Sequence, residues 1–153
     1  MNRLRKIVQR SAFITVAVIA SLGQAHAAVS CHKISADGVG QAFNNGTTEA
    51  QIIGGGLLHG TTQGSFVVTG GAVPVFDIGG TVIFTTRQAT LTVALAGTFD
   101  VATGAFVTTG PVTSATGKLA GATGTLTLEG VQDLSTGKFT EGVSGLICVD
   151  LEA

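Results

Sequence analysis

The chain has 153 residues, which is the length of one ordinary domain. Only 11% of the residues are charged and 44% are hydrophobic, and this composition excludes intrinsic disorder. The 23 Gly with only 2 Pro and no Gly-X-Y period exclude collagen, and the 22 Thr favour strands and turns over helices.

Residues 1–27 have the pattern of a secretory signal peptide. Basic side chains precede an apolar run over 12–20, and Ala-His-Ala at 25–27 is a small-x-small cleavage pattern. Because spanning a bilayer takes about 20 apolar residues, we expect cleavage and a secreted or periplasmic protein with no membrane span afterwards. A retained N-terminal anchor is one alternative. A lipoprotein acylated at Cys31, which follows a small residue, is another.

Cleavage would leave an acidic chain. Four of the eight basic residues and none of the nine acidic ones lie in the first ten positions, so four basic and nine acidic residues would be left, a net charge of −5. Nucleic-acid binding needs several cations on one face. The remaining four are scattered along the chain, at 33, 87, 118 and 138. We therefore expect no nucleic-acid partner.

The two cysteines, Cys31 and Cys148, lie near the two ends of the region 28–153. An even number in an exported chain predicts a disulfide bond, which would tie the first strand to the last. A reactive thiol or a metal ligand is the alternative, but no C-x-x-C and no nearby His pair accompanies Cys148. We expect no metal and no cofactor.

Nearly all of 28–153 shows the period-2 alternation of β-strands, most clearly over 90–100. Eight or nine strands are expected, around 31–36, 48–53, 61–70, 72–78, 80–87, 90–100, 105–114, 125–129 and 138–151. One apolar face of the later strands is the expected lining of a ligand site. Its residues are Leu91, Val93, Leu95, Phe99, Leu126, Leu128, Phe139 and Val143.

Short turn signals separate these strands. Asp-Val-Ala-Thr-Gly-Ala-Phe at 100–106 and Asp-Leu-Ser-Thr-Gly-Lys-Phe at 133–139 repeat one phrase. In it Asp can accept hydrogen bonds from the backbone ahead and Gly supplies a positive φ. Asn-Asn-Gly at 44–46 is a further hairpin signal. One Asp in each repeated loop is too few oxygen ligands for calcium.

Consecutive hairpins without a long helical segment predict an all-β, antiparallel domain over 28–153. A barrel removes both sheet edges, whereas the alternative, a β-sandwich, keeps some. Glycines inside the strands, at 97, 130, 142 and 145, suit the sharply coiled strands of a barrel. We therefore expect a single eight-stranded barrel. It is not of the outer-membrane kind, because the sequence has no Trp or Tyr for aromatic girdles.

The stretch Ala-Thr-Gly-Lys-Leu-Ala-Gly-Ala-Thr-Gly-Thr-Leu-Thr at 115–127 resembles the T-G-x-F-x-G-A-x-G stretch of the allene oxide cyclase and dirigent-like barrels. The resemblance covers about 97–149, with 97–110 in the place of the Gly-rich hairpin and Leu119 where the family has Phe. It implies an eight-stranded antiparallel barrel around an apolar cavity. No catalytic residue of that superfamily falls on a matched motif, so none is carried over.

Motifs for nucleophilic, metal or phosphate chemistry are absent from the sequence. Two polar residues are candidates for catalysis, Glu141 and Arg87. Glu141 lies two residues from both Phe139 and Val143, so it shares their face of the strand and could point inward as an acid or base with a raised pKa. Because buried Glu is rare, we expect a strand end or bulge to turn it to solvent. Arg87 could clamp an anionic ligand or be a solvated hairpin charge.

Three functions are compatible with these features. The first is an exported barrel that binds a small apolar ligand or serves as a scaffold. The second is a cofactor-free cyclase or isomerase that folds a flexible substrate inside the barrel. The third is a cell-surface or self-assembling protein that associates through strand edges. The sequence leaves the oligomeric state open.

Overall fold

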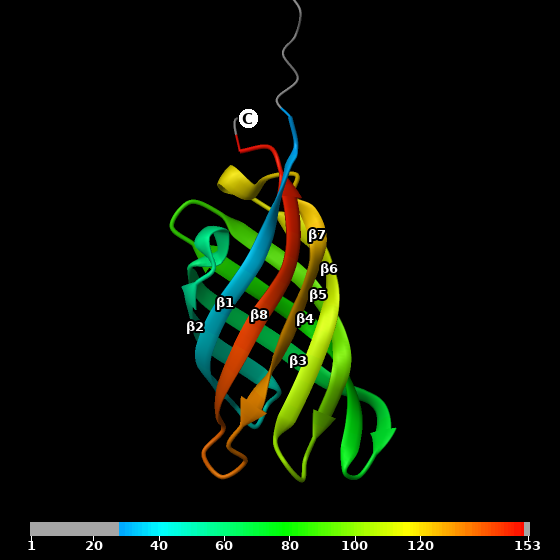
Figure 1. Cartoon of the computed structure of the whole chain (residues 1–153). Helices are drawn as coiled ribbons and strands as arrows, with labels where there is room; N and C mark the ends of the chain where they lie inside the picture. The colour runs from blue at the N-terminus through cyan, green and yellow to red at the C-terminus, as the bar shows by residue number, and fades with distance from the viewer. Residues whose placement is uncertain (1–27, 152–153) are drawn as a thin grey trace, which may run out of the picture.

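Eight antiparallel strands, each paired with its neighbours in chain order, close into a barrel (Figure 1). The structure, a computed structural model, describes residues 28–151, so the expected signal peptide at 1–27 lies outside the described residues. The strands are β1 (Ser30–Ala42), β2 (Thr47–Gly54), β3 (Gly60–Ala72), β4 (Val75–Thr86), β5 (Thr90–Asp100), β6 (Ala105–Ala115), β7 (Thr123–Gln132) and β8 (Lys138–Val149). The predicted eight-stranded barrel is confirmed, and the sandwich alternative is excluded.

Two short 3₁₀ helices interrupt the strands. η1 (Gly56–Leu58) lies between β2 and β3, and η2 (Gly117–Leu119) lies between β6 and β7. Neither of them, nor any other helix within residues 28–151, has the length and apolar character needed to cross a membrane.

Pairing of β1 with β8 closes the barrel. The ladder runs without a register shift from Ser30 opposite Val149 to Gln41 opposite Lys138. Every described strand is therefore paired on both sides, and none presents an open edge. The close approach of a neighbouring strand explains Gly97, because a Cβ there would collide with a backbone carbonyl oxygen of β6.

The two strands expected at 72–78 and 80–87 are one. β4 runs unbroken through Gly79 and Gly80, which therefore do not end a strand. A Cβ at Gly80 would collide with the backbone oxygen of Ser65 and lie 2.7 Å from the ring of Phe66. The double glycine lets β3 and an aromatic ring come close to β4, and it does not mark the strand boundary that the expected ranges placed there.

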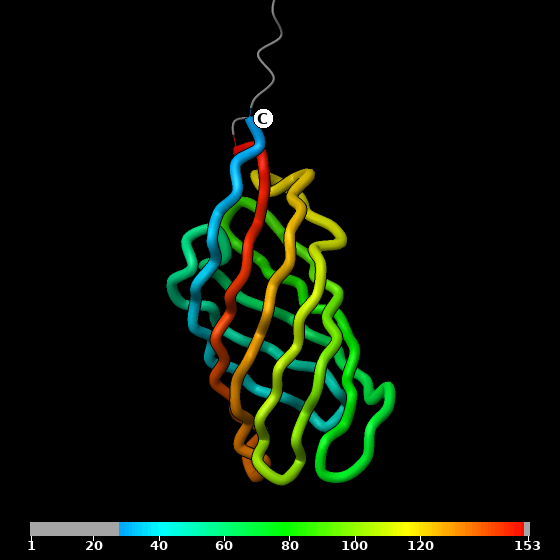
Figure 2. The backbone as a smooth tube through the Cα atoms, turned by 45° about the vertical axis from the view of Figure 1, so that its right-hand side comes forward, coloured from blue at the N-terminus to red at the C-terminus, as the bar shows by residue number. Residues whose placement is uncertain are grey.

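The two ends of the barrel differ, as Figures 1 and 2 show. At the 3₁₀ end, β1 begins, β8 ends, and both 3₁₀ helices lie beside the barrel mouth. The opposite end, here called the hairpin end, carries the four turns 43–46, 73–74, 101–104 and 133–137. Leu58 of η1 and Leu119 of η2 are only 0% and 2% exposed, and both belong to the main apolar cluster. Apolar side chains thus plug the 3₁₀ end.

The predicted disulfide bond is confirmed. Cys31 and Cys148 are direct partners in the β1–β8 ladder, with Cα atoms 3.9 Å apart, and they are 117 positions apart in the sequence. The bond lies on the outer face, across the seam that closes the barrel. An intramolecular disulfide suggests an oxidising compartment.

The repeated phrase forms two matching hairpin turns. The amide of Gly104 donates to the carbonyl of Asp100 at 2.8 Å, and that of Gly137 donates to the carbonyl of Asp133 at 2.7 Å. Each carboxylate also accepts a 2.8 Å bond from the amide two residues on. Hydrogen bonds, foremost from the Ser135 hydroxyl, lower the pKa of Asp133 to about 2. The Asn-Asn-Gly turn at 44–46 is confirmed as well.

Candidate functional site

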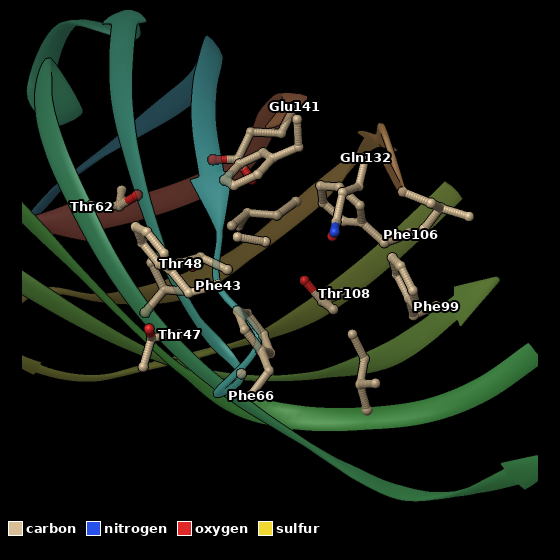
Figure 3. A pocket seen from close by; sticks show the side chains of 17 residues that line it. Phe43, Thr47, Thr48, Thr62, Phe66, Phe99, Phe106, Thr108, Gln132 and Glu141 are labelled. Atoms are coloured by element: carbon tan, nitrogen blue, oxygen red, sulfur yellow. The ribbon is translucent and has the colours of Figure 1, made fainter. Parts of the chain in front are cut away.

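A cavity of about 270 Å³ opens at the hairpin end of the barrel (Figure 3). Its wall is mainly apolar and aromatic, as expected where inward positions of several strands converge. The aromatic lining consists of Phe43, Phe66, Phe99, Phe106 and Phe139. A hollow hairpin end thus contrasts with the plugged 3₁₀ end.

Two of these rings come from the repeated phrase. Phe106 and Phe139 are its last residues, and each is an inward residue of the strand that follows its turn. Their centroids lie 6.0 Å apart at an interplanar angle of 85°, an edge-to-face contact. The phrase therefore does more than form a turn, because it also places one aromatic ring in the cavity wall at each occurrence.

Glu141 lies inside the barrel, only 8% exposed, and lines the cavity. The expectation that a strand end or bulge turns it to solvent is wrong. β8 pairs without a register shift on both sides, so the inward parity of Phe139 continues at Glu141. Its ladder partners are two glycines, Gly38 on β1 and Gly130 on β7. A Cβ at Gly38 would lie 2.7 Å from the Glu141 Cγ, so this glycine makes the room that the carboxyl side chain occupies.

The carboxylate of Glu141 has no partner among the described residues. No hydrogen bond or ion pair from them reaches it, and no side-chain nitrogen or oxygen of the described chain is both fully buried and unpaired. Its oxygens therefore face the cavity. Removal from water raises the pKa of Glu141 from 4.5 to about 7, because burial disfavours the charged form. The other polar residues of the lining are neutral: Thr47, Thr48, Thr62, Thr108 and Gln132.

The second catalytic candidate lies elsewhere. Arg87 is exposed in the turn between β4 and β5, at the 3₁₀ end. It borders a separate surface hollow together with His59 and Lys118. Arg87 and Glu141 are thus at opposite ends of the barrel and cannot act on one small substrate.

The predicted lining face is divided between cavity and core. Three of its residues line the cavity: Phe99, Leu128 and Phe139. The other five pack in the apolar core and do not line it, which corrects the expectation for Leu91, Val93, Leu95, Leu126 and Val143. Alternation identifies the inward face of a strand but not the height at which the interior changes from filled to hollow.

Several lining residues were missed. Thr62 and Thr108 are buried polar residues of the wall, and Phe66 and Phe106 supply rings to it. The repeat carried the signal for Phe106, because Phe139 ends the second copy. Phe43 lies in a turn and is 46% exposed at the mouth, and no strand periodicity could assign it to the cavity.

No family model, curated protein or solved structure matches this chain. The resemblance to the allene oxide cyclase and dirigent-like barrels stays a prediction. Within residues 28–151, no three His, Cys, Asp or Glu residues gather as a metal site would require.

Proposed function

We propose that the protein is an exported binder of one small, mostly apolar ligand, held in the cavity at the hairpin end. The observation that carries this proposal is the cavity with five phenylalanines in its wall. Ligand sites are typically concave and apolar with a few polar groups for orientation. The volume of about 270 Å³ lies just below their usual range of roughly 300–1,000 Å³, which suits a small ligand. At ~30 Å³ for each water-sized group, the space suits a ligand of about nine such groups.

The mouth of the cavity supports the same function. Phe43 and Leu134 come from two different turns and are 46% and 49% exposed, yet both line the cavity. A bound apolar ligand would cover part of this surface, at about 25 cal/mol for each Å² removed from water. Export is supported by the signal-peptide pattern at 1–27 and by the disulfide bond.

Toluene is a suitable first probe because it has no polar group. We expect toluene to bind saturably and to raise the urea concentration at which the protein unfolds. At a hundred times its Kd, toluene should raise the free energy of unfolding by about 2.7 kcal/mol. Thr108→Leu adds carbon atoms inside the cavity and should abolish this increase. Val107→Leu, on the outer face of the same strand, is the matched control and should preserve it. No saturable binding, or equal binding by both variants, would contradict the proposal.

A second candidate function is a cofactor-free cyclase or isomerase. Glu141 favours it, since a cavity-facing carboxyl with a pKa of about 7 is suited to proton transfer near neutral pH. The cavity could also hold a flexible substrate in one conformation. Turnover of any substrate found should then be lost in Glu141→Gln while binding persists. Assembly through strand edges is not proposed, because the described strands leave no edge unpaired.

A further inference from the structure

Among the described residues, the cavity lining has one acidic group and no basic one. Of the lining side chains within 28–151, only Glu141 can ionise. The neighbouring strands face it with neutral groups, namely Gly38 on β1, Thr48 on β2, Thr62 on β3, Val82 on β4, Thr108 on β6 and Leu128 on β7. An ionised carboxylate here is largely removed from bulk water and has no counter-charge from the described residues, and an unpaired charge so placed is costly. A ligand that brings a cation would supply the missing partner.

Aromatic rings line the same cavity as Glu141, close to its position on β8. A Cβ at Gly130, the ladder partner of Glu141, would lie 2.8 Å from Cζ of Phe106 and 2.9 Å from Cα of Glu141. Phe139 precedes Glu141 by two residues on the same inward face of β8, and its ring contacts that of Phe106. The faces of aromatic rings attract cations, most strongly where water is excluded. Carboxylate and rings thus favour the same kind of charge.

The charge around the protein acts in the same direction. The chain without residues 1–27 has a net charge of −5. At the hairpin end, Asp100 and Asp133 flank two of the turns and Lys138 follows one of them, whereas Arg87 and Lys118 lie at the 3₁₀ end. A negative field at the mouth raises the local concentration of cations and lowers that of anions.

We propose that the ligand of this cavity is a hydrophobic amine, whose ammonium group pairs with the Glu141 carboxylate and whose aryl or short alkyl body packs among the phenylalanine rings. This inference rests on the proposed function and narrows its ligand class. The ammonium group has three donors. One meets the carboxylate, and the wall also holds neutral hydroxyl groups that can accept hydrogen bonds, those of Thr62 and Thr108 among them (Figure 3). A carboxylic acid of the same shape would place two like charges together, and an alcohol would leave the carboxylate without a counter-charge.

Calorimetry with three ligands of matched shape tests the charge preference. These are 2-phenylethylamine, 2-phenylethanol and phenylacetate, each titrated into the protein without residues 1–27 at about pH 8. The amine should bind at least about tenfold more tightly than the alcohol, and phenylacetate should bind most weakly. Glu141→Gln should lower the amine affinity about tenfold or more and leave the alcohol affinity unchanged. Glu129→Gln removes an outward-facing charge from β7 and should change neither affinity.

The wild-type protein alone provides a second measurement, which holds if the Gln variant does not fold. Below pH 7 the carboxyl group is mostly protonated and must release its proton to solvent when the ammonium ion pairs with it. Amine affinity should therefore fall roughly tenfold from pH 8 to pH 6, with close to one proton released for each complex at pH 6. Titrations in two buffers of different ionisation enthalpy measure this release.

The outcomes separate the two proposals. Equal binding of amine and alcohol, or amine binding without proton release at pH 6, would overturn the amine assignment and leave apolar-ligand binding intact. If toluene, the amine and the alcohol all fail to bind, the proposed function is wrong and this inference is wrong with it. Tight, proton-releasing binding of the amine that Glu141→Gln weakens would support both.

Discussion

Replacing Glu141 by Gln removes the one ionisable side chain among the described residues that line the cavity, and Gln has nearly the same size as Glu. In the folded protein burial raises the pKa of this group from 4.5 to about 7. In the unfolded chain the carboxyl is in water and titrates near its ordinary value. The free energy of unfolding must therefore depend on pH through this residue, and the Gln variant must lack that dependence.

Between pH 4.5 and 7 the folded state holds a proton that the unfolded state has lost. Stability therefore falls as the pH rises through this window, because it rises with pH only where the unfolded state binds more protons. The two pKa values correspond to a loss of about 3 kcal/mol, at about 1.4 kcal/mol for each tenfold change in proton affinity. Glu141→Gln should accordingly gain about 3 kcal/mol relative to the wild type on going from about pH 4 to about pH 8.

Urea unfolding of both proteins at several pH values between about 4 and about 9 measures this difference. Only the difference between the two curves is informative, since other groups titrate equally in both. Asp133, with its pKa lowered to about 2, contributes stability that is lost below this window, as the pH falls from 3.8 towards 2. Glu129→Gln, with its side chain on the outer face, should give a curve parallel to the wild type. If Glu141→Gln also gives a parallel curve, the group is solvated and the reasoning fails.

Three further changes have defined outcomes. Replacing Cys31 and Cys148 by Ala should remove up to about 5 kcal/mol of unfolding free energy, because the bond closes a loop of 117 positions; an unchanged urea midpoint would show that the bond adds nothing to the β1–β8 ladder. Gly38→Ala places a methyl group 2.7 Å from the side chain of Glu141 and should lower the free energy of unfolding, measured by thermal unfolding, by about 1–3 kcal/mol. Gly142→Ala is the control, because its added Cβ meets nothing closer than 4.0 Å, and it should lower the free energy of unfolding by less. Leu58→Ala at the plugged end should cost about 2–5 kcal/mol in urea unfolding and leave toluene affinity unchanged; weakened toluene binding would mean that the two ends are not independent.

Local patterns in the sequence were sufficient to predict the architecture. Alternation identified most strands, the Asp–Gly phrase identified two hairpins, and the even cysteine count predicted the bond that closes the ladder. These features are set by residues within one strand or turn, or by the compartment, so no long-range information was needed. The double glycine at 79–80 shows where this fails, because a glycine that admits a neighbouring strand and one that ends a strand look alike in sequence.

The site depended on contacts across strands. The alternation of β8 alone placed Glu141 on the inward face. Because buried carboxyl groups are rare, however, we expected its side chain to be exposed to solvent. What decides the matter is its pairing with Gly38 and Gly130, which lie 103 and 11 positions away. In the same way, the leucines of η1 and η2 determine which half of the barrel is filled. Their inward placement depends on the whole barrel, so periodicity could not assign the core and the cavity separately.

The central claim is that the hairpin end of the barrel is an accessible apolar site while the 3₁₀ end is filled. Intermolecular nuclear Overhauser effects between protonated 2-phenylethylamine or toluene and the isotope-labelled protein test it most directly. We predict contacts from the bound ligand to the ring protons of Phe66, Phe106 and Phe139 and none to Leu91 or Leu126. Contacts to those leucines, or only to side chains on the outer face of the barrel, would contradict the account.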